Sequence, residues 1–205
     1  MMSDMADRVS IAPLPAPLAW DVAPGRWNLG EGPLLTVAAP AGTDLFSDPA
    51  GGTPLATAPR LLGPVAGDFQ LSARVRCTFA GAFDAGALLL WAGERRWVKL
   101  AFEVAPQGEP MVVSVVTDGR SDDANAFVVP GDAVWLRISR IATACALHAR
   151  LDGEGWRFVR HFALAAPDGL RAGFLVQSPT GDGATARFDE IGYVPERLPD
   201  LRSGV

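Results

Sequence analysis

One stretch of the sequence alternates strictly for eleven residues, Phe69-Gln70-Leu71-Ser72-Ala73-Arg74-Val75-Arg76-Cys77-Thr78-Phe79. Its odd-numbered positions are apolar and its even-numbered positions are polar. Because successive side chains of a β-strand point to opposite faces, this period of two predicts a long antiparallel strand with one buried face. Other segments must supply the neighbouring strands and the layer that covers the apolar side.

Short apolar or alternating segments, separated by Gly, Pro and Asp, continue from residue 60 to residue 194. The turn signals include Asp152-Gly153, a dipeptide typical of β-hairpins. This spacing is typical of sandwiches and barrels, and helices are nearly absent. We therefore predict an all-β fold, a two-sheet antiparallel β-sandwich, with further strands near residues 84–92, 97–104, 110–117, 133–141, 144–151, 156–163, 170–178 and 185–194.

The first sixty residues contain nine of the 17 prolines, which interrupt extended pairing and predict short edge strands and loops that wrap the sandwich. We expect a flexible N-terminal segment over residues 1–17, a single domain over residues 18–195 and a flexible C-terminal tail over residues 196–205. A chain of 205 residues is long enough to bury a substantial core in one such domain.

The composition excludes several classes of function. The chain is 49% hydrophobic and 20% charged, which is too apolar for disorder, and it has no long uncharged apolar run. The net charge is −5 and the 18 Lys and Arg residues are scattered, so we expect neither nucleic acid nor membrane as a partner.

Asp4 and Asp7 stand where a secretory signal needs positive charge, which predicts a cytoplasmic protein. There, Cys77 and Cys145 are expected to be buried free thiols.

Several phrases of the sequence, taken together, resemble one family of bacterial and fungal proteins. They lie at residues 42–49, 67–69, 83–88, 114–117, 121–123, 152–153, 156 and 160–162, and include Trp97-Val98-Lys99-Leu100-Ala101-Phe102-Glu103, Trp135-Leu136-Arg137-Ile138-Ser139-Arg140 and Gly173-Phe174-Leu175-Val176-Gln177-Ser178-Pro179. Their order resembles the concanavalin-A-like domains of unknown function often labelled "regulation of enolase protein 1" (domain of unknown function 1349), over about residues 20 to 194. The resemblance implies a two-sheet jelly roll with a concave front sheet, in a superfamily rich in sugar-binding lectins and glycoside hydrolases. It implies no agreed activity.

The strand expected near residues 97–104 carries the main candidate binding residues. Trp97, Lys99 and Glu103 share the face opposite the apolar one. Trp135 and Arg137 repeat this arrangement in the strand at 133–141, and would extend the same surface if both strands lay in one sheet. Indole rings stack on the C–H faces of sugars, while charged and amide groups bond the hydroxyls. We predict a carbohydrate ligand on the concave face, bound by Trp97, Lys99, Glu103, Trp135, Arg137, Asp84 and Gln177.

Three other interpretations stay open at this point. Lys99, Glu103 and Arg137 can form an ion-pair network on a solvated face without any ligand. A sugar-active hydrolase or isomerase would use Glu103 with a second carboxylate, that of Asp84, Asp122 or Asp123, although the superfamily's Glu-x-Asp-x-x-Glu signature does not occur at Glu103. A protein-interaction or homodimerisation domain would use the exposed aromatic face around Trp97.

A metal site has weaker support. Ser121-Asp122-Asp123-Ala124-Asn125 offers oxygen ligands of the kind that calcium accepts, so Asp122 and Asp123 are candidate ligands. The run lacks the regular spacing of a calcium loop, and Asp and Asn after a glycine turn more often form Asx-turns. Neither histidine has metal-ligand spacing to other ligands. We therefore expect no cofactor, with calcium as the alternative.

Overall fold

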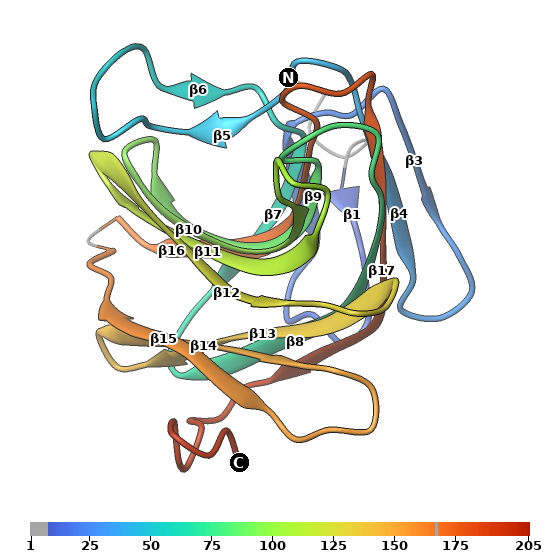
Figure 1. Ribbon diagram of the computed structural model, residues 1–205. Helices are drawn as coiled ribbons and strands as arrows, with labels where there is room; N and C mark the ends of the chain where they lie inside the picture. Colours follow the sequence, from blue (N-terminus) through green and yellow to red (C-terminus); the bar gives the residue numbers. More distant parts are fainter. Residues whose placement is uncertain (1–7, 167) are drawn as a thin grey trace, which may run out of the picture.

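The computed structural model describes residues 8–166 and 168–205, and every regular element in this part of the chain is a β-strand (Figure 1). The same residues contain no helix, and therefore none that is long and apolar enough to cross a membrane. The predicted all-β class is confirmed.

The strands form two large antiparallel sheets, which we call the front sheet and the back sheet. In spatial order the front sheet contains β1 (Arg8–Val9), β2 (Leu18–Val22), β7 (Arg60–Val65), β16 (Leu170–Gln177), β9 (Ala85–Gly93), β10 (Arg96–Val104), β11 (Pro110–Asp118) and β12 (Arg120–Val128). The back sheet contains β15 (Arg157–Ala163), β14 (Ala144–Arg150), β13 (Ala133–Ile141), β8 (Phe69–Thr78), β17 (Ala184–Val194), β4 (Leu35–Ala39) and β3 (Arg26–Leu29). A small hairpin of β5 (Leu45–Phe46) and β6 (Leu55–Ala56) stands apart from both.

The main core lies between the two sheets. The alternating stretch that opens the sequence is β8, in the middle of the back sheet between β13 and β17, and its odd-numbered side chains from Phe69 to Val75 are fully buried. Val98, Leu100 and Phe102 of β10 meet them from the front sheet. Each such apolar side chain, once buried, stabilises the fold by about 1.5–3 kcal/mol. The free thiol of Cys145 is also part of this core, and that of Cys77 packs partly buried against it.

Every strand expected after residue 60 is present, with ends within one residue of the prediction. The hairpin between β14 and β15 turns at Asp152-Gly153 as expected, with Gly153 at a φ of 71°. Two strands in this part of the chain were not predicted. One is β7, and the other is β12 over residues 120–128, where we expected a polar turn. The first sixty residues supply short strands at the edges of both sheets and the β5–β6 hairpin, which crosses the hollow of the curved front sheet (Figure 1).

The two segments that we expected to be flexible make packing contacts. Residues 1–7 of the N-terminal segment lie outside the described residues, whereas Val9 and Ile11 are buried in the main core. The tail over residues 196–205 lies on the outer face of the back sheet. There, Nε2 of His148 donates a hydrogen bond to the carbonyl of Leu201 at 2.7 Å, and Leu198 is 3% exposed.

Candidate functional site

The concave face of the front sheet carries a second layer of buried side chains. Trp97, Lys99, Ala101 and Glu103 point to this face, as the alternation of β10 predicts. Small or apolar residues of the flanking strands surround Trp97 and Ala101, among them Ala85, Ala87, Leu89, Trp91, Val113, Val115 and Leu175. A sheet that is apolar on both faces needs a cover on each side.

Residues 43–58 provide that cover, and we call them the covering segment. Leu45 packs into the second apolar layer and is 1% exposed. At one end, Thr43 bridges to Ser178 after β16. Farther along, the N–H of Ser47 donates to Oγ of Ser121 at 3.0 Å, and the N–H of Ser121 donates to the Ser47 carbonyl at 2.8 Å.

Trp97 is therefore 1% exposed, and its ring packs beneath the covering segment. The prediction that Trp97 forms an open stacking surface for a sugar was wrong. The cause is a tertiary contact, because the covering segment lies about fifty residues before β10 in the sequence. The same burial removes the exposed aromatic face on which the homodimer hypothesis depended.

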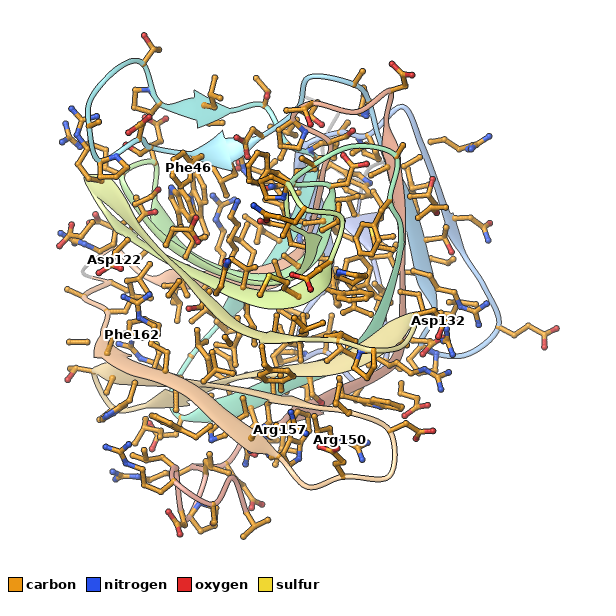
Figure 2. The ribbon with its side chains drawn as sticks, viewed as in Figure 1. Phe46, Asp122, Asp132, Arg150, Arg157 and Phe162 are labelled. Atoms are coloured by element: carbon orange, nitrogen blue, oxygen red, sulfur yellow. The ribbon has the colours of Figure 1, made fainter. Side chains whose placement is uncertain are left out.

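One end of the concave face stays open as a pocket of about 260 Å³, which we call the acidic pocket. Three of the predicted binding residues, Lys99, Glu103 and Gln177, come together there. The pocket is also lined by Asp44, Phe46, Phe83 and Val115, which were not predicted as site residues, and by Asp123, which was predicted only as a metal or catalytic candidate. Asp44, Phe46 and Phe83 lie within phrases that carry the family resemblance, which was the available signal. Figure 2 shows Phe46 below β5, in the hollow of the front sheet.

Lys99 ties three parts of the chain together at the floor of the acidic pocket. Its side chain is 3% exposed. Nζ donates to the carbonyl of Leu45 at 3.0 Å and to Oε1 of Gln177 at 2.8 Å, while Oδ1 of Asp44 lies 3.9 Å away. Gln177 in turn donates through Nε2 to the carbonyl of Phe83 at 3.0 Å. The ammonium group is thus already bonded inside the protein. The predicted ion-pair network of Lys99 and Glu103 with Arg137 is not formed.

Glu103 and Asp123 also face the pocket, but neighbouring groups compensate their negative charge less completely. Glu103 is 8% exposed, and its carboxylate forms no hydrogen bond or ion pair with any residue of the described chain. Burial raises the pKa of Glu103 to about 7, with further increases from Asp123 and Asp44 and an opposing effect of Lys99. Burial also raises the pKa of Asp123, against the lowering effect of Lys99. Glu103 can therefore give or accept a proton near neutral pH.

Phe83 lines the pocket and has an unusual backbone conformation. Its φ of 68° lies in the left-handed region, which a residue with a bulky side chain rarely adopts. Two hydrogen bonds hold it: its N–H donates to the carbonyl of Val104 at 2.8 Å, and its carbonyl accepts from Gln177. The side chain is 40% exposed. Such strain persists only where the surrounding structure enforces it, and it is concentrated at functional sites.

Asp84 does not belong to the acidic pocket, so its predicted role was wrong. It is fully buried, and Oδ2 accepts hydrogen bonds from the N–H groups of Ala80 at 2.7 Å and Gly81 at 2.9 Å. These bonds close the turn that leads into β9. Asp84 acts as a turn residue, as short polar side chains often do.

Trp135 and Arg137 lie in the back sheet, on its outer face, so the expectation that they share a surface with Trp97 was wrong. Nε1 of Trp135 donates to Glu190 at 2.8 Å. The guanidinium of Arg137 lies 4.2 Å from the ring centre of Trp156 and donates to the carbonyl of Gly204 at 2.6 Å. The bond from Arg137 to Gly204 holds the C-terminal tail, on the side of the molecule opposite the pocket.

The segment that holds the candidate calcium ligands Asp122 and Asp123 is part of β12. Asp122 and Asp123 pair with Val116 and Val115 of β11, so their side chains point to opposite faces. Asp122 forms an ion pair with Arg160 at 3.0 Å, while Asp123 faces the acidic pocket. Within residues 8–166 and 168–205, no group of three or more His, Cys, Asp or Glu side chains is placed to hold a metal ion.

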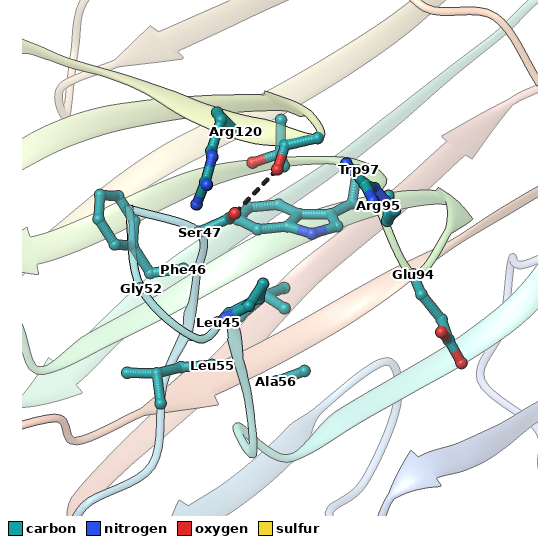
Figure 3. A pocket seen from close by; sticks show the side chains of 13 residues that line it. Leu45, Phe46, Ser47, Gly52, Leu55, Ala56, Glu94, Arg95, Trp97 and Arg120 are labelled. Carbon is teal, nitrogen blue, oxygen red and sulfur yellow. Dashed lines mark hydrogen bonds between the residues drawn. The ribbon is translucent and has the colours of Figure 1, made fainter. Parts of the chain in front are cut away.

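A second pocket of about 220 Å³ lies farther along the covering segment (Figure 3). Phe46 lines both pockets. The hydroxyl of Ser47 donates to the carbonyl of Gly119 at 2.9 Å, and this bond fixes one wall. The lining is mostly apolar, with Glu94, Arg95 and Arg120 at the rim.

The model of one family, described as "Protein of unknown function (DUF1349)", matches residues 20–195. The chain belongs to the DUF1349 family. No curated protein matches the sequence. The resemblance drawn from the sequence phrases is thereby confirmed.

Solved structures share the fold of this DUF1349 protein at low sequence identity. A functionally unknown protein from Saccharomyces cerevisiae has a TM-score of 0.79 and 22% identity, over 86% of this chain and 95% of that chain. A GH43 protein, BlXynB, from Bacillus licheniformis has a TM-score of 0.67 and 13% identity, over 86% of this chain and 36% of that chain. An alginate lyase from Klebsiella pneumoniae has a TM-score of 0.53 and 12% identity, over 82% and 83% of the two chains. These likenesses concern the fold alone.

Proposed function

We propose that this DUF1349 protein binds a small carbohydrate in the acidic pocket. The observation that carries the proposal is the lining itself: an ammonium group, an amide and three carboxylates surround about 260 Å³ beside the rings of Phe46 and Phe83. Sugars require this combination, because their hydroxyls need charged or amide partners while their C–H faces need an aromatic surface.

The polar groups of the pocket are preorganised for such a ligand. Lys99 and Gln177 are held by hydrogen bonds to each other and to the backbone, so they lose little freedom on binding. Glu103 has acceptor sites that no described residue uses, and a sugar hydroxyl is a suitable donor. Phe83 offers an exposed ring whose backbone is fixed by hydrogen bonds on both sides. The structural neighbours named as a GH43 protein and an alginate lyase add support at the level of the fold only.

The test is a thermal-shift and calorimetric titration of the purified chain against neutral mono- and disaccharides. A ligand that binds only the folded state raises the melting temperature in a saturable way. Phe83→Ala should weaken that binding about two- to tenfold, since a ring contact contributes about 0.5–1.5 kcal/mol. The control is Val128→Ala, an exposed apolar residue of β12 that does not line the pocket. If no sugar shifts the melting temperature, the proposal is wrong.

A sugar-active enzyme is the second candidate, and one observation favours it. Glu103 has a pKa of about 7 and lies near the carboxyl groups of Asp123 and Asp44, an arrangement that suits general acid–base chemistry. In that case Glu103→Gln abolishes turnover of the bound sugar while its affinity changes little. For a binding module, no turnover is observed with the wild type, and the same variant changes affinity only.

A further inference from the structure

We propose that the acidic pocket selects sugars that carry an amino group, because Glu103 and Asp123 face it without a cationic partner while its one cation, Lys99, is bonded to the protein. The inference rests on the proposed carbohydrate function and narrows the class of ligand. The inference concerns the charge of the ligand, whereas the proposed function concerns binding of the sugar ring. An experiment can therefore contradict one proposal and leave the other intact.

The charges of the lining do not balance. Lys99 is the only cation among the lining residues, against the three carboxylates of Asp44, Glu103 and Asp123. Two of the bonds of Lys99 go to neutral oxygens, those of Leu45 and Gln177. Oδ1 of Asp44 is 3.9 Å from Nζ and also accepts the N–H of Leu45 at 2.7 Å. Lys99 therefore offsets the carboxylates only in part: it lowers the pKa of Glu103 and of Asp123, but burial raises both pKa values above the ordinary ones.

Glu103 and Asp123 remain as acceptors directed at the ligand. Within the described residues, neither carboxylate forms an ion pair, and Glu103 is more than nine-tenths buried. Arg160 lies on the other side of β12, where it forms an ion pair with Asp122 at 3.0 Å. It affects Asp123 only by a longer-range electrostatic interaction. A buried carboxylate without a partner is unfavourable, and an ammonium group supplies the missing charge and donors.

The aromatic part of the lining suits the same group. Phe46 and Phe83 both border the pocket, and the face of an aromatic ring attracts a cation. Carboxylates and aromatic rings together are a favourable environment for an ammonium group attached to an apolar ring face. A sugar acid would instead place a fourth carboxylate among three, and should be rejected.

The inference has a pH dependence. The charged groups that face Glu103 are Lys99 on its own strand, Asp123 on β12 and Asp44 in the covering segment. With a pKa of about 7, Glu103 ionises across the neutral range. An ammonium ligand favours the ionised form, so its binding should release a proton and strengthen from pH 6 to pH 7.5. A neutral sugar that uses the same carboxylate as an acceptor should show a much smaller change.

The experiment is isothermal titration of the full chain at pH 7 with three matched probes: methyl β-glucosaminide, methyl β-glucoside and methyl β-glucuronide, together with the same series built on galactose. The amino sugar should bind at least about tenfold more tightly than the neutral one, which corresponds to about 1.4 kcal/mol. The uronide should bind at least about tenfold more weakly than the neutral sugar.

Asp123→Asn should reduce the preference for the amino sugar over the neutral sugar at least about threefold. The matched control is Asp122→Asn, the adjacent position of β12, whose side chain points to the opposite face. Because both positions lie on a polar, largely exposed strand, both variants should fold, which circular dichroism checks.

The outcomes separate the two proposals. Equal binding of the amino and neutral sugars overturns the amino-sugar inference and leaves the carbohydrate function intact. Cyclohexylamine, which has an amino group but no hydroxyl, is titrated as a further probe. If it binds as tightly as the amino sugar, the pocket is a site for amines in general, and the carbohydrate function is overturned. If none of the probes binds, both proposals are wrong.

Discussion

Replacing Glu103 by Gln should stabilise the ligand-free protein, and by an amount that grows with pH. Gln keeps the size of the side chain but removes the charge that is buried at neutral pH. Burial raises the pKa of Glu103 from its ordinary value of 4.5 to about 7. Since a pKa difference of one corresponds to about 1.4 kcal/mol, the buried charge destabilises the folded state by about 3 kcal/mol once both states are ionised.

The sign follows from which state ionises first. Below pH 4.5 the carboxyl is protonated in the folded and the unfolded chain, and stability is unaffected. Between pH 4.5 and 7 the unfolded chain ionises while the folded chain stays protonated, so the free energy of unfolding of the wild type falls. The gain from Glu103→Gln should therefore be below about 1 kcal/mol at pH 5 and about 3 kcal/mol at pH 8.

Urea unfolding followed by tryptophan fluorescence at pH 5, 6, 7 and 8 measures this difference. The same substitution at the exposed Glu109 shows whether loss of a carboxylate has an effect by itself. A difference between variant and wild type that does not change with pH would refute the assignment of Glu103 as a buried, mostly uncompensated acid.

Three further predictions concern the framework around the pocket. Trp97→Ala removes a fully buried ring and should lower the free energy of unfolding by about 4 kcal/mol, measured in urea; a loss below 1 kcal/mol would contradict its burial. Gly173→Ala should prevent folding or strongly destabilise the folded protein, because an added Cβ would collide with a backbone carbonyl of β7. Gly155→Ala should be tolerated, because Gly155 has open space around it. Expression and circular dichroism compare the two variants. The raised pKa values of Cys77 and Cys145, caused by burial, should make both thiols react slowly with Ellman's reagent at pH 8 until urea exposes them, and rapid labelling of the native protein would contradict this.

The sequence predicted most of the strands, because their patterns are local. Alternation or a short apolar run marks each of the strands that were predicted after residue 60, and Asp-Gly marks the hairpin after β14. β12 was missed because it lies at the edge of the sheet and is exposed over much of its length, so its sequence carries no apolar period. Residues 120–128 form a strand because they pair with β11, and their own composition does not indicate one.

The site was harder to predict, because it depends on which strands become neighbours. The alternation of β10 correctly placed Lys99 and Glu103 on one face. The same pattern occurs at Trp135, and nothing in it indicates that β13 belongs to the other sheet. Asp44 and Phe46 reach the pocket through the covering segment, whose docking is a long-range contact. A pattern within one strand does not contain such contacts.

The covering segment has a consequence for how the chain folds and how it fails. It is synthesised before the strands on which it rests, and its platform is complete only when Leu175 of β16 has joined the front sheet. Until then, or whenever the segment detaches, Leu89, Trp97 and Val113 form part of a broad apolar surface open to water. Surfaces of this kind drive association between chains. Loss of the cover should therefore lead to aggregation before the sandwich itself unfolds, and a ligand that contacts both Phe46 of the covering segment and Glu103 of β10 should delay both processes.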